Sequence, residues 1–196
     1  MTLPDLPPHT CYVEIWPSTY QRLFRKSLSL VEVYNDHGET ALLFRLLREQ
    51  PQALLEAVKS DELDQHLSDE RACYQRLLRD WHFSQQTMQN ALPKRVEALR
   101  ANLLAPYRRL RTVLFEALEW RDCLERYNDP RALHILEPPW TRTERDEWAA
   151  LQLRLARSRM QWRLALPRDI ADRRFPGSSI IAQEDNVIWL APSKKG

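Results

Sequence analysis

Apolar residues recur every three or four positions over much of the chain, and the longest such run extends from Ser68 to Arg126. This spacing places one apolar side chain on the same helical face at nearly every turn, which is typical of an amphipathic helix. The positions on that face are Tyr74, Leu77, Trp81, Met88, Leu92, Val96, Leu99 and Leu103. Pro93 and Pro106 interrupt the run, because a proline inside a helix removes a backbone donor. The pattern therefore predicts an approach helix, a short middle segment and a following helix that ends near Tyr127.

Helical periodicity continues on both sides of this run. Residues 18–34 are predicted to form one helix, and residues 39–66 are predicted to form three short ones. Thr141 and Glu144 have the spacing of a capping box, in which two side chains satisfy the free donors at a helix start. They precede an apolar pattern that predicts a last long helix over residues 142–166.

Three shorter segments depart from helical spacing. The polarity of Tyr12–Ile15 alternates, which predicts a short strand. Ser179–Ala182 and Val187–Leu190 are separated by four polar residues and predict a β-hairpin. Residues 128–139 contain the turn-forming sequences NDP and EPP and are expected to be a connector, with a short turn around Ala132–Leu136.

Together these elements predict a mainly α protein, a single-domain helical bundle with a kinked long central helix and a small β-hairpin near the C-terminus. The expected organisation is an N-terminal arm (1–17), the bundle (18–176), and the hairpin with its tail (177–196). The strand at Tyr12–Ile15 is expected to pair with the hairpin. Only three glycines occur in 196 residues, which argues against a large antiparallel sheet with many tight turns.

Charge is distributed unevenly along the chain. Residues 1–70 contain 6 basic and 12 acidic side chains, whereas the remainder contains 23 basic and 15 acidic ones. A cationic second part suggests a polyanion or an acidic protein as a partner, although the acidic first part could neutralise it within the fold. Arginine outnumbers lysine 24 to 5. Arginine suits bidentate phosphate contacts, but a GC-rich, bacterial-like composition gives the same excess.

The motifs of several common chemistries are missing from the sequence. Three glycines cannot form either of the glycine-rich loops that bind nucleotide phosphates. The five histidines and three cysteines are scattered without metal-ligand spacing, so no cofactor and no metal is expected. Free, unpaired cysteines indicate a reducing compartment. No apolar run approaches about 18 residues, so we expect a cytoplasmic protein without a membrane span.

Two arginine-rich stretches carry the strongest indication of function. Lys94–Arg111 and Arg154–Arg174 each have a net charge of +5. Such clusters can neutralise phosphates and give salt-sensitive, sequence-independent binding of nucleic acid. The candidate contact residues are Lys94, Arg95, Arg100, Arg108, Arg109, Arg111, Arg154, Arg157, Arg159, Arg163, Arg173 and Arg174. Solvated arginines beside a buried stripe, or arginines paired with the acidic first part, are the alternative interpretation.

The sequence thus favours a non-catalytic accessory subunit that binds nucleic acid or a nucleoprotein assembly. The rival hypothesis is a helical protein–protein adaptor or oligomerisation module without nucleic-acid contact, because the last predicted helix has a second apolar stripe of Leu153, Met160 and Leu164. An enzyme of unfamiliar type is a third hypothesis, for which no catalytic residues can be named.

Overall fold

The computed structural model describes residues 6–18, 21–50, 107–139, 145–184 and 186–193. The chain divides into two compact units, one formed by residues 1–37 and 114–196 and the other by residues 38–113. Most of the long run from Ser68 to Arg126, including the predicted kink, lies outside the described residues. No helix in the described ranges is both long and apolar enough to cross a lipid bilayer.

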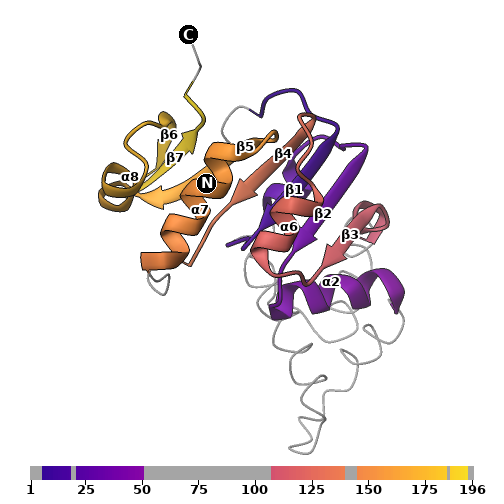
Figure 1. Cartoon of the computed structure of the whole chain (residues 1–196). Coiled ribbons are helices and arrows are strands. Elements are labelled where there is room, and N and C mark those ends of the chain that lie inside the picture. Colours follow the sequence, from indigo (N-terminus) through magenta and orange to yellow (C-terminus); the bar gives the residue numbers. More distant parts are fainter. Residues whose placement is uncertain (1–5, 19–20, 51–106, 140–144, 185, 194–196) are drawn as a thin grey trace, which may run out of the picture. The chain divides into compact units, whose positions relative to one another are not determined.

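A seven-stranded mixed sheet dominates the structure, with the order β3-β2-β1-β4-β5-β7-β6 (Figure 1). Four of its strands form a parallel centre in which β1 pairs with β2 and β4, and β4 pairs with β5. Strand β7 is antiparallel to both β5 and β6. The strands are β1 Cys11–Ile15, β2 Val31–Asn35, β3 Val113–Glu116, β4 Ala132–Leu136, β5 Gln161–Pro167, β6 Ser179–Glu184 and β7 Val187–Ala191.

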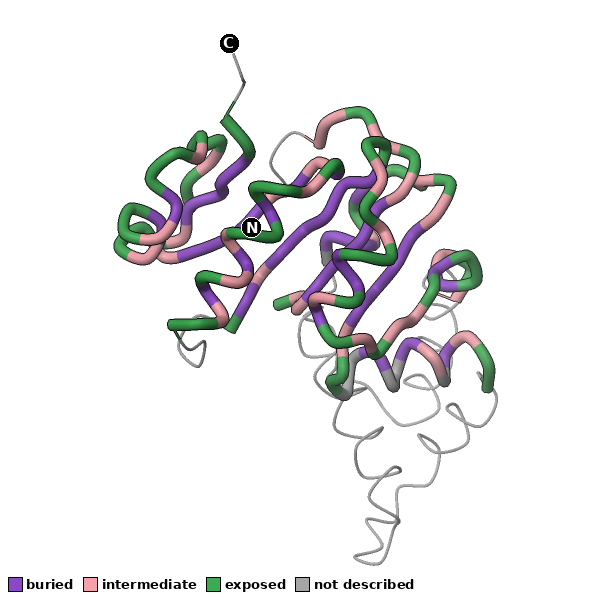
Figure 2. The backbone as a smooth tube through the Cα atoms, in the orientation of Figure 1, coloured by how far each residue is buried: buried purple, intermediate pink, exposed green. Residues whose placement is uncertain are grey.

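Helices cover both faces of this sheet, which makes the unit a doubly wound α/β fold. On one face, α6 (Trp120–Arg126), α7 (Arg145–Arg157) and α8 (Arg168–Arg174) pack over the apolar core. The opposite face meets α1 (Gln21–Arg25) and the loop that follows it. Figure 2 shows that the central strands are buried along almost their whole length.

The other unit is described at α2 (Glu39–Glu49) and at residues 107–113. Within it, the Arg48 guanidinium donates from Nη1 to the carbonyl of Val113 at 2.7 Å and pairs with Glu49 at 2.5 Å. Phe44, Leu47 and Leu110 are buried.

The mainly α, single-domain helical bundle expected from the sequence is therefore wrong, because the structure has a large mixed sheet with short helices. The predicted helix over residues 18–34 is replaced by α1 and β2, and the one over 142–166 by α7 and β5. The connector at Ala132–Leu136 is the fully buried strand β4. In the two predicted helices, the apolar residues of the short strands β2 and β5 fall at helical spacing by coincidence. The connector is predicted from turn-forming residues that flank β4.

Two β predictions are confirmed and one pairing is corrected. The strand at Tyr12–Ile15 exists as β1, and the C-terminal hairpin exists as β6 and β7. Strand β1 pairs with β2 and β4, however, and not with the hairpin. The glycine argument applied only to antiparallel sheets, since parallel strands are joined by helices and do not need positive-φ hairpin turns.

Strand β6 lies at the edge of the sheet, and its regular pairing with β7 is broken by a bulge between Ile180 and Ala182. Ile180 and Ile181 are exposed there.

His134 is a titratable side chain buried in the core. Its ring lies on the completely buried strand β4 and donates from Nε2 to the Tyr127 carbonyl at 3.1 Å. Burial lowers the pKa of His134 from 6.5 to about 4. Between pH 6.5 and 4, His134 is therefore protonated in the unfolded chain but neutral in the folded protein. The folded state loses stability as the pH falls through this range.

We expect the free energy of unfolding to fall between pH 6.5 and 4.5 by up to about 1.4 kcal/mol per pH unit through this one residue. Urea unfolding at several pH values measures the effect. In His134→Phe, which keeps a ring but cannot titrate, that part of the pH dependence should disappear. Equal pH dependence in the two proteins would contradict the assignment.

Candidate functional site

In open α/β sheets, ligands bind outside the carboxyl ends of the parallel strands, where the strand order reverses. In this chain that point lies between β1 and β4, whose last paired residues are Ile15 and Leu136. The residues that follow them are Trp16 to Ser18 on one side and Glu137 to Pro139 on the other. The candidate site is therefore built from these two turns.

Glu137 joins the two turns. Its carboxylate accepts hydrogen bonds from the Ser18 backbone N–H and the Ser18 hydroxyl, both at 2.8 Å, and forms an ion pair with Arg22. The Glu137 N–H also donates to the carbonyl of Ile15 at 3.2 Å. The side chains of Arg22 and Glu137 are only 3% and 7% exposed. We call this arrangement of Ser18, Arg22 and Glu137 the switch-point clamp.

Trp16 begins the first turn in a left-handed backbone conformation, with φ 54°. Glycine is the usual residue there, because a side chain in this conformation costs about 1–2 kcal/mol. The indole of Trp16 contacts that of Trp120, with ring centroids 5.6 Å apart. This ring contact compensates part of the backbone strain.

Trp120 is fixed in turn by charged neighbours. Its Nε1 donates to Glu147 at 3.0 Å, and the Arg121 guanidinium lies 4.4 Å from its ring centroid. Arg121 also pairs with Glu147 at 2.6 Å and with Glu119 at 3.1 Å. The hydrogen bond from Arg121 lowers the pKa of Glu147.

The turn after β1 is poorly suited to phosphate. Dinucleotide folds use glycines there so that backbone N–H groups can approach the anion, whereas this chain has Trp16 and then Pro17, which has no N–H. The carboxylate of Glu137 is next to the turn and would repel an anion. Asp36 follows β2, at the position where such folds bind a ribose hydroxyl. Among the described residues, no group of three or more His, Cys, Asp or Glu could hold a metal ion.

The structure places the first predicted basic stretch only in part. Lys94, Arg95 and Arg100 lie outside the described residues. In the unit of residues 38–113, Arg108 and Arg111 are exposed and Arg109 is half-buried.

The second predicted stretch is divided over three places. Arg163 lies on β5, where it is half-buried, donates to the Trp162 carbonyl at 3.0 Å, and has its pKa lowered by burial. Arg173 and Arg174 end α8, and Arg173 pairs with Asp169 at 2.7 Å. Arg154, Arg157 and Arg159 lie at the end of α7 and in the loop before β5.

This last group has neighbours that the sequence did not reveal. Adjacent parallel strands bring the loop before β4 next to the loop before β5. Asn128 joins these loops, because its Oδ1 accepts from the N–H of Arg159 at 2.8 Å and from that of Met160 at 3.3 Å. Arg154 pairs with Glu125 at 2.5 Å. We define the amino-end arginine cluster as Arg126, Arg131, Arg154, Arg157 and Arg159.

All five side chains of the amino-end arginine cluster are exposed. Three carboxylates pair with its members: Glu125 with Arg154, Asp129 with Arg131, and Glu116 with Arg126 at 3.1 Å. The cluster and these carboxylates together carry a net charge of +2. Arg131 donates to Asp129 at 3.2 Å and lowers the pKa of that carboxyl. Arg126 and Arg131 could have been recognised from the sequence only if Ala132–Leu136 had been predicted as a strand.

The second apolar stripe does not form a surface. Met160 and Leu164 are buried within the core cluster, whereas Leu153 is exposed on α7. Of the three contact residues in the adaptor hypothesis, two therefore lie in the protein's own core.

No protein-family model matches the chain, and a search of curated proteins finds no similar sequence. The functional argument therefore rests on the geometry alone.

The switch-point clamp makes a prediction about stability. Glu137→Gln should lower the free energy of unfolding by about 3–5 kcal/mol, because it removes a negative charge that is paired with the buried Arg22 guanidinium. The double variant Arg22→Met/Glu137→Leu removes both charges and should recover much of that loss. Urea unfolding of Arg22→Met, Glu137→Leu and the double variant gives the coupling energy, and purely additive effects would contradict a clamp.

The backbone at Trp16 makes a second prediction. Trp16→Gly and Trp16→Ala both lose the contact with Trp120, but only glycine accepts a φ of 54° without strain. The glycine variant should therefore be about 1 kcal/mol more stable than the alanine variant. This order is the reverse of the usual one, in which alanine is favoured, and urea midpoints measure it. A more stable alanine variant would show that the turn relaxes out of the left-handed conformation.

Proposed function

We propose that this protein is a non-catalytic nucleic-acid-binding protein, and that it contacts the phosphate backbone through the amino-end arginine cluster. The observation that carries the proposal is that five exposed arginines lie at the ends of α6 and α7 and in the two loops that follow these helices. Asn128 joins the two loops before β4 and β5. Guanidinium groups suit phosphate because they present several donors in a fixed plane.

The carboxyl ends of the parallel strands support a role without catalysis. The place where a doubly wound sheet binds its ligand is occupied by the side chains of Ser18, Arg22 and Glu137, and their polar groups are directed at one another. A ligand would have to break a buried ion pair in order to enter. Binding of a partner at the other end of the strands leaves this contact intact.

The charges in the cluster also fit a partner with many negative groups. Glu125, Asp129 and Glu116 pair with Arg154, Arg131 and Arg126. The five arginines and these three carboxylates together carry a net charge of +2. An exposed ion pair contributes little stability by itself. Its arginine can therefore exchange a carboxylate for a phosphate at small cost.

Binding to fluorescent single- and double-stranded oligonucleotides over a salt series tests the proposal. The logarithm of the affinity should fall linearly with the logarithm of salt concentration, with a slope of about 0.9 per phosphate contact on duplex. Arg157→Ala/Arg159→Ala should weaken binding and make this slope shallower by about 2. The matched control, Arg168→Ala/Arg173→Ala, removes the same charge from α8 and should change both much less. Absence of binding at low salt, or equal effects of the two double variants, would refute the proposal.

A further inference from the structure

We propose that Leu28 and Leu30 are apolar wedges that enter the base stack of double-stranded DNA held by the amino-end arginine cluster. This inference rests on the proposed function and specifies its partner as duplex. The two side chains are 69% and 85% exposed, although they belong to a loop of only a few residues between α1 and β2. Isolated exposed leucines are ordinary on protein surfaces, but this pair lies on a loop that the protein holds firmly.

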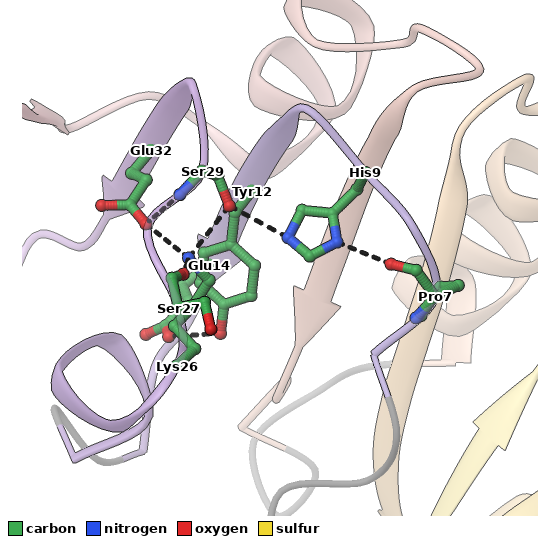
Figure 3. Close-up of polar contacts among 8 residues, drawn as sticks. All are labelled: Pro7, His9, Tyr12, Glu14, Lys26, Ser27, Ser29 and Glu32. Carbon is green, nitrogen blue, oxygen red and sulfur yellow. Dashed lines mark hydrogen bonds and ion pairs between the residues drawn. The ribbon is translucent and has the colours of Figure 1, made fainter.

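Polar contacts hold the loop, and among them the Lys26–Glu32 ion pair is buried (Figure 3). The Lys26 ammonium donates to the Ser27 carbonyl at 2.6 Å and to the Ser29 hydroxyl at 3.0 Å, and it forms an ion pair with Glu32. The Ser29 N–H donates to Glu32 at 3.0 Å. The Ser29 hydroxyl also lies 3.0 Å from Nε2 of His9.

These contacts alternate with the leucines along the chain. The Ser27 carbonyl and the Ser29 N–H and hydroxyl are hydrogen-bonded within the protein, while the side chains of Leu28 and Leu30 are exposed to solvent. The Lys26 ammonium also lies 4.4 Å from the ring centroid of Tyr12, so its position is fixed by the sheet. A loop ordered in advance loses little further entropy on binding, which favours insertion into a partner.

The leucines and the arginines lie at the same ends of the parallel strands, the amino ends. Leu30, Thr10 and Arg131 directly precede the first residues of β2, β1 and β4. Arg159 lies two residues before β5, which pairs with β4. The Val31 N–H donates to the backbone carbonyl of Thr10 at 3.0 Å, and the Thr10 N–H donates to the backbone carbonyl of Arg131 at 2.9 Å. Since neighbouring strands are about 4.8 Å apart, Leu30 lies roughly 10 Å from Arg131.

Apolar side chains beside arginines match duplex DNA. Proteins that bend DNA place Arg or Lys against the phosphates and insert Leu, Ile or Phe between base pairs from the minor groove. Unstacking costs a few kcal/mol per step, and the closer approach of the cationic surface to the phosphates offsets that cost. An anionic lipid surface would also engage leucines and arginines, so the experiment includes it as a competing outcome.

The test uses the full chain and a duplex of about 20 base pairs that carries a fluorophore at each end. The unaltered protein should bend the duplex and raise energy transfer between its ends. Leu28→Ser/Leu30→Ser should lose most of this increase while still binding in a salt-dependent manner, because the arginines remain. Leu153→Ser is the control, because it replaces an exposed leucine outside this loop, on α7. This variant should bend the duplex as the unaltered protein does. Urea midpoints establish that the variants remain folded.

Each alternative result has a distinct meaning. Bending that survives in Leu28→Ser/Leu30→Ser overturns the wedge and leaves the proposed function standing. Unaltered affinity in Arg157→Ala/Arg159→Ala overturns the proposed function and the wedge with it. Binding to phosphatidylserine–phosphatidylcholine vesicles that the leucine substitutions abolish, without bending of the duplex, overturns the wedge in favour of a lipid surface.

Discussion

Strand β1 is enclosed on every side, and this constraint determines much of the rest of the structure. It has a parallel strand at each edge and helices over each face, so every polar group that it carries must be satisfied inside the protein. Glu14 on β1 is buried and accepts a hydrogen bond from Tyr12 at 2.7 Å. Glu32 on the neighbouring strand is buried and paired with Lys26. Lys26, which follows α1, therefore supplies the cation that allows Glu32 to lie buried in the sheet.

The two ends of the parallel strands have opposite characters. At the carboxyl ends, Arg22 and Glu137 neutralise each other in a nearly solvent-free contact. At the amino ends, the arginines exceed the carboxylates and face solvent. Charges are thus neutralised within the protein at the carboxyl ends of the strands, where this fold normally binds its ligand. At the amino ends, positive charges are exposed. This contrast is why we propose a binding site at the amino ends.

The sequence allowed only part of this fold to be predicted. Alternation of polar and apolar residues identified β1, and turn residues between two short apolar runs identified the hairpin, because both signals are local. Strand β4 could not be recognised, because a strand buried on both faces does not alternate, and ALHIL reads equally well as a turn of helix. Strand β5 placed Trp162 and Leu166 in helical register with α7, which concealed the break between them.

The same limitation affected the candidate site. Arg154, Arg157 and Arg159 were identified from local charge density, but Arg126 and Arg131 join them only through the pairing of β4 with β5. The contact of Glu137 with Ser18 spans 119 residues and depends on the order of the strands. Such contacts follow from topology, and no short window of sequence contains them.

The bulge in β6 bears on how copies of this protein meet one another. An edge strand presents unpaired backbone donors and acceptors, and exposed isoleucines would make a regular edge adhesive. The bulge between Ile180 and Ala182 shifts the hydrogen-bonding groups out of register. A second copy could then pair with only a few residues before the ladder fails. The irregularity therefore allows the sheet to end in solvent without becoming a template for aggregation.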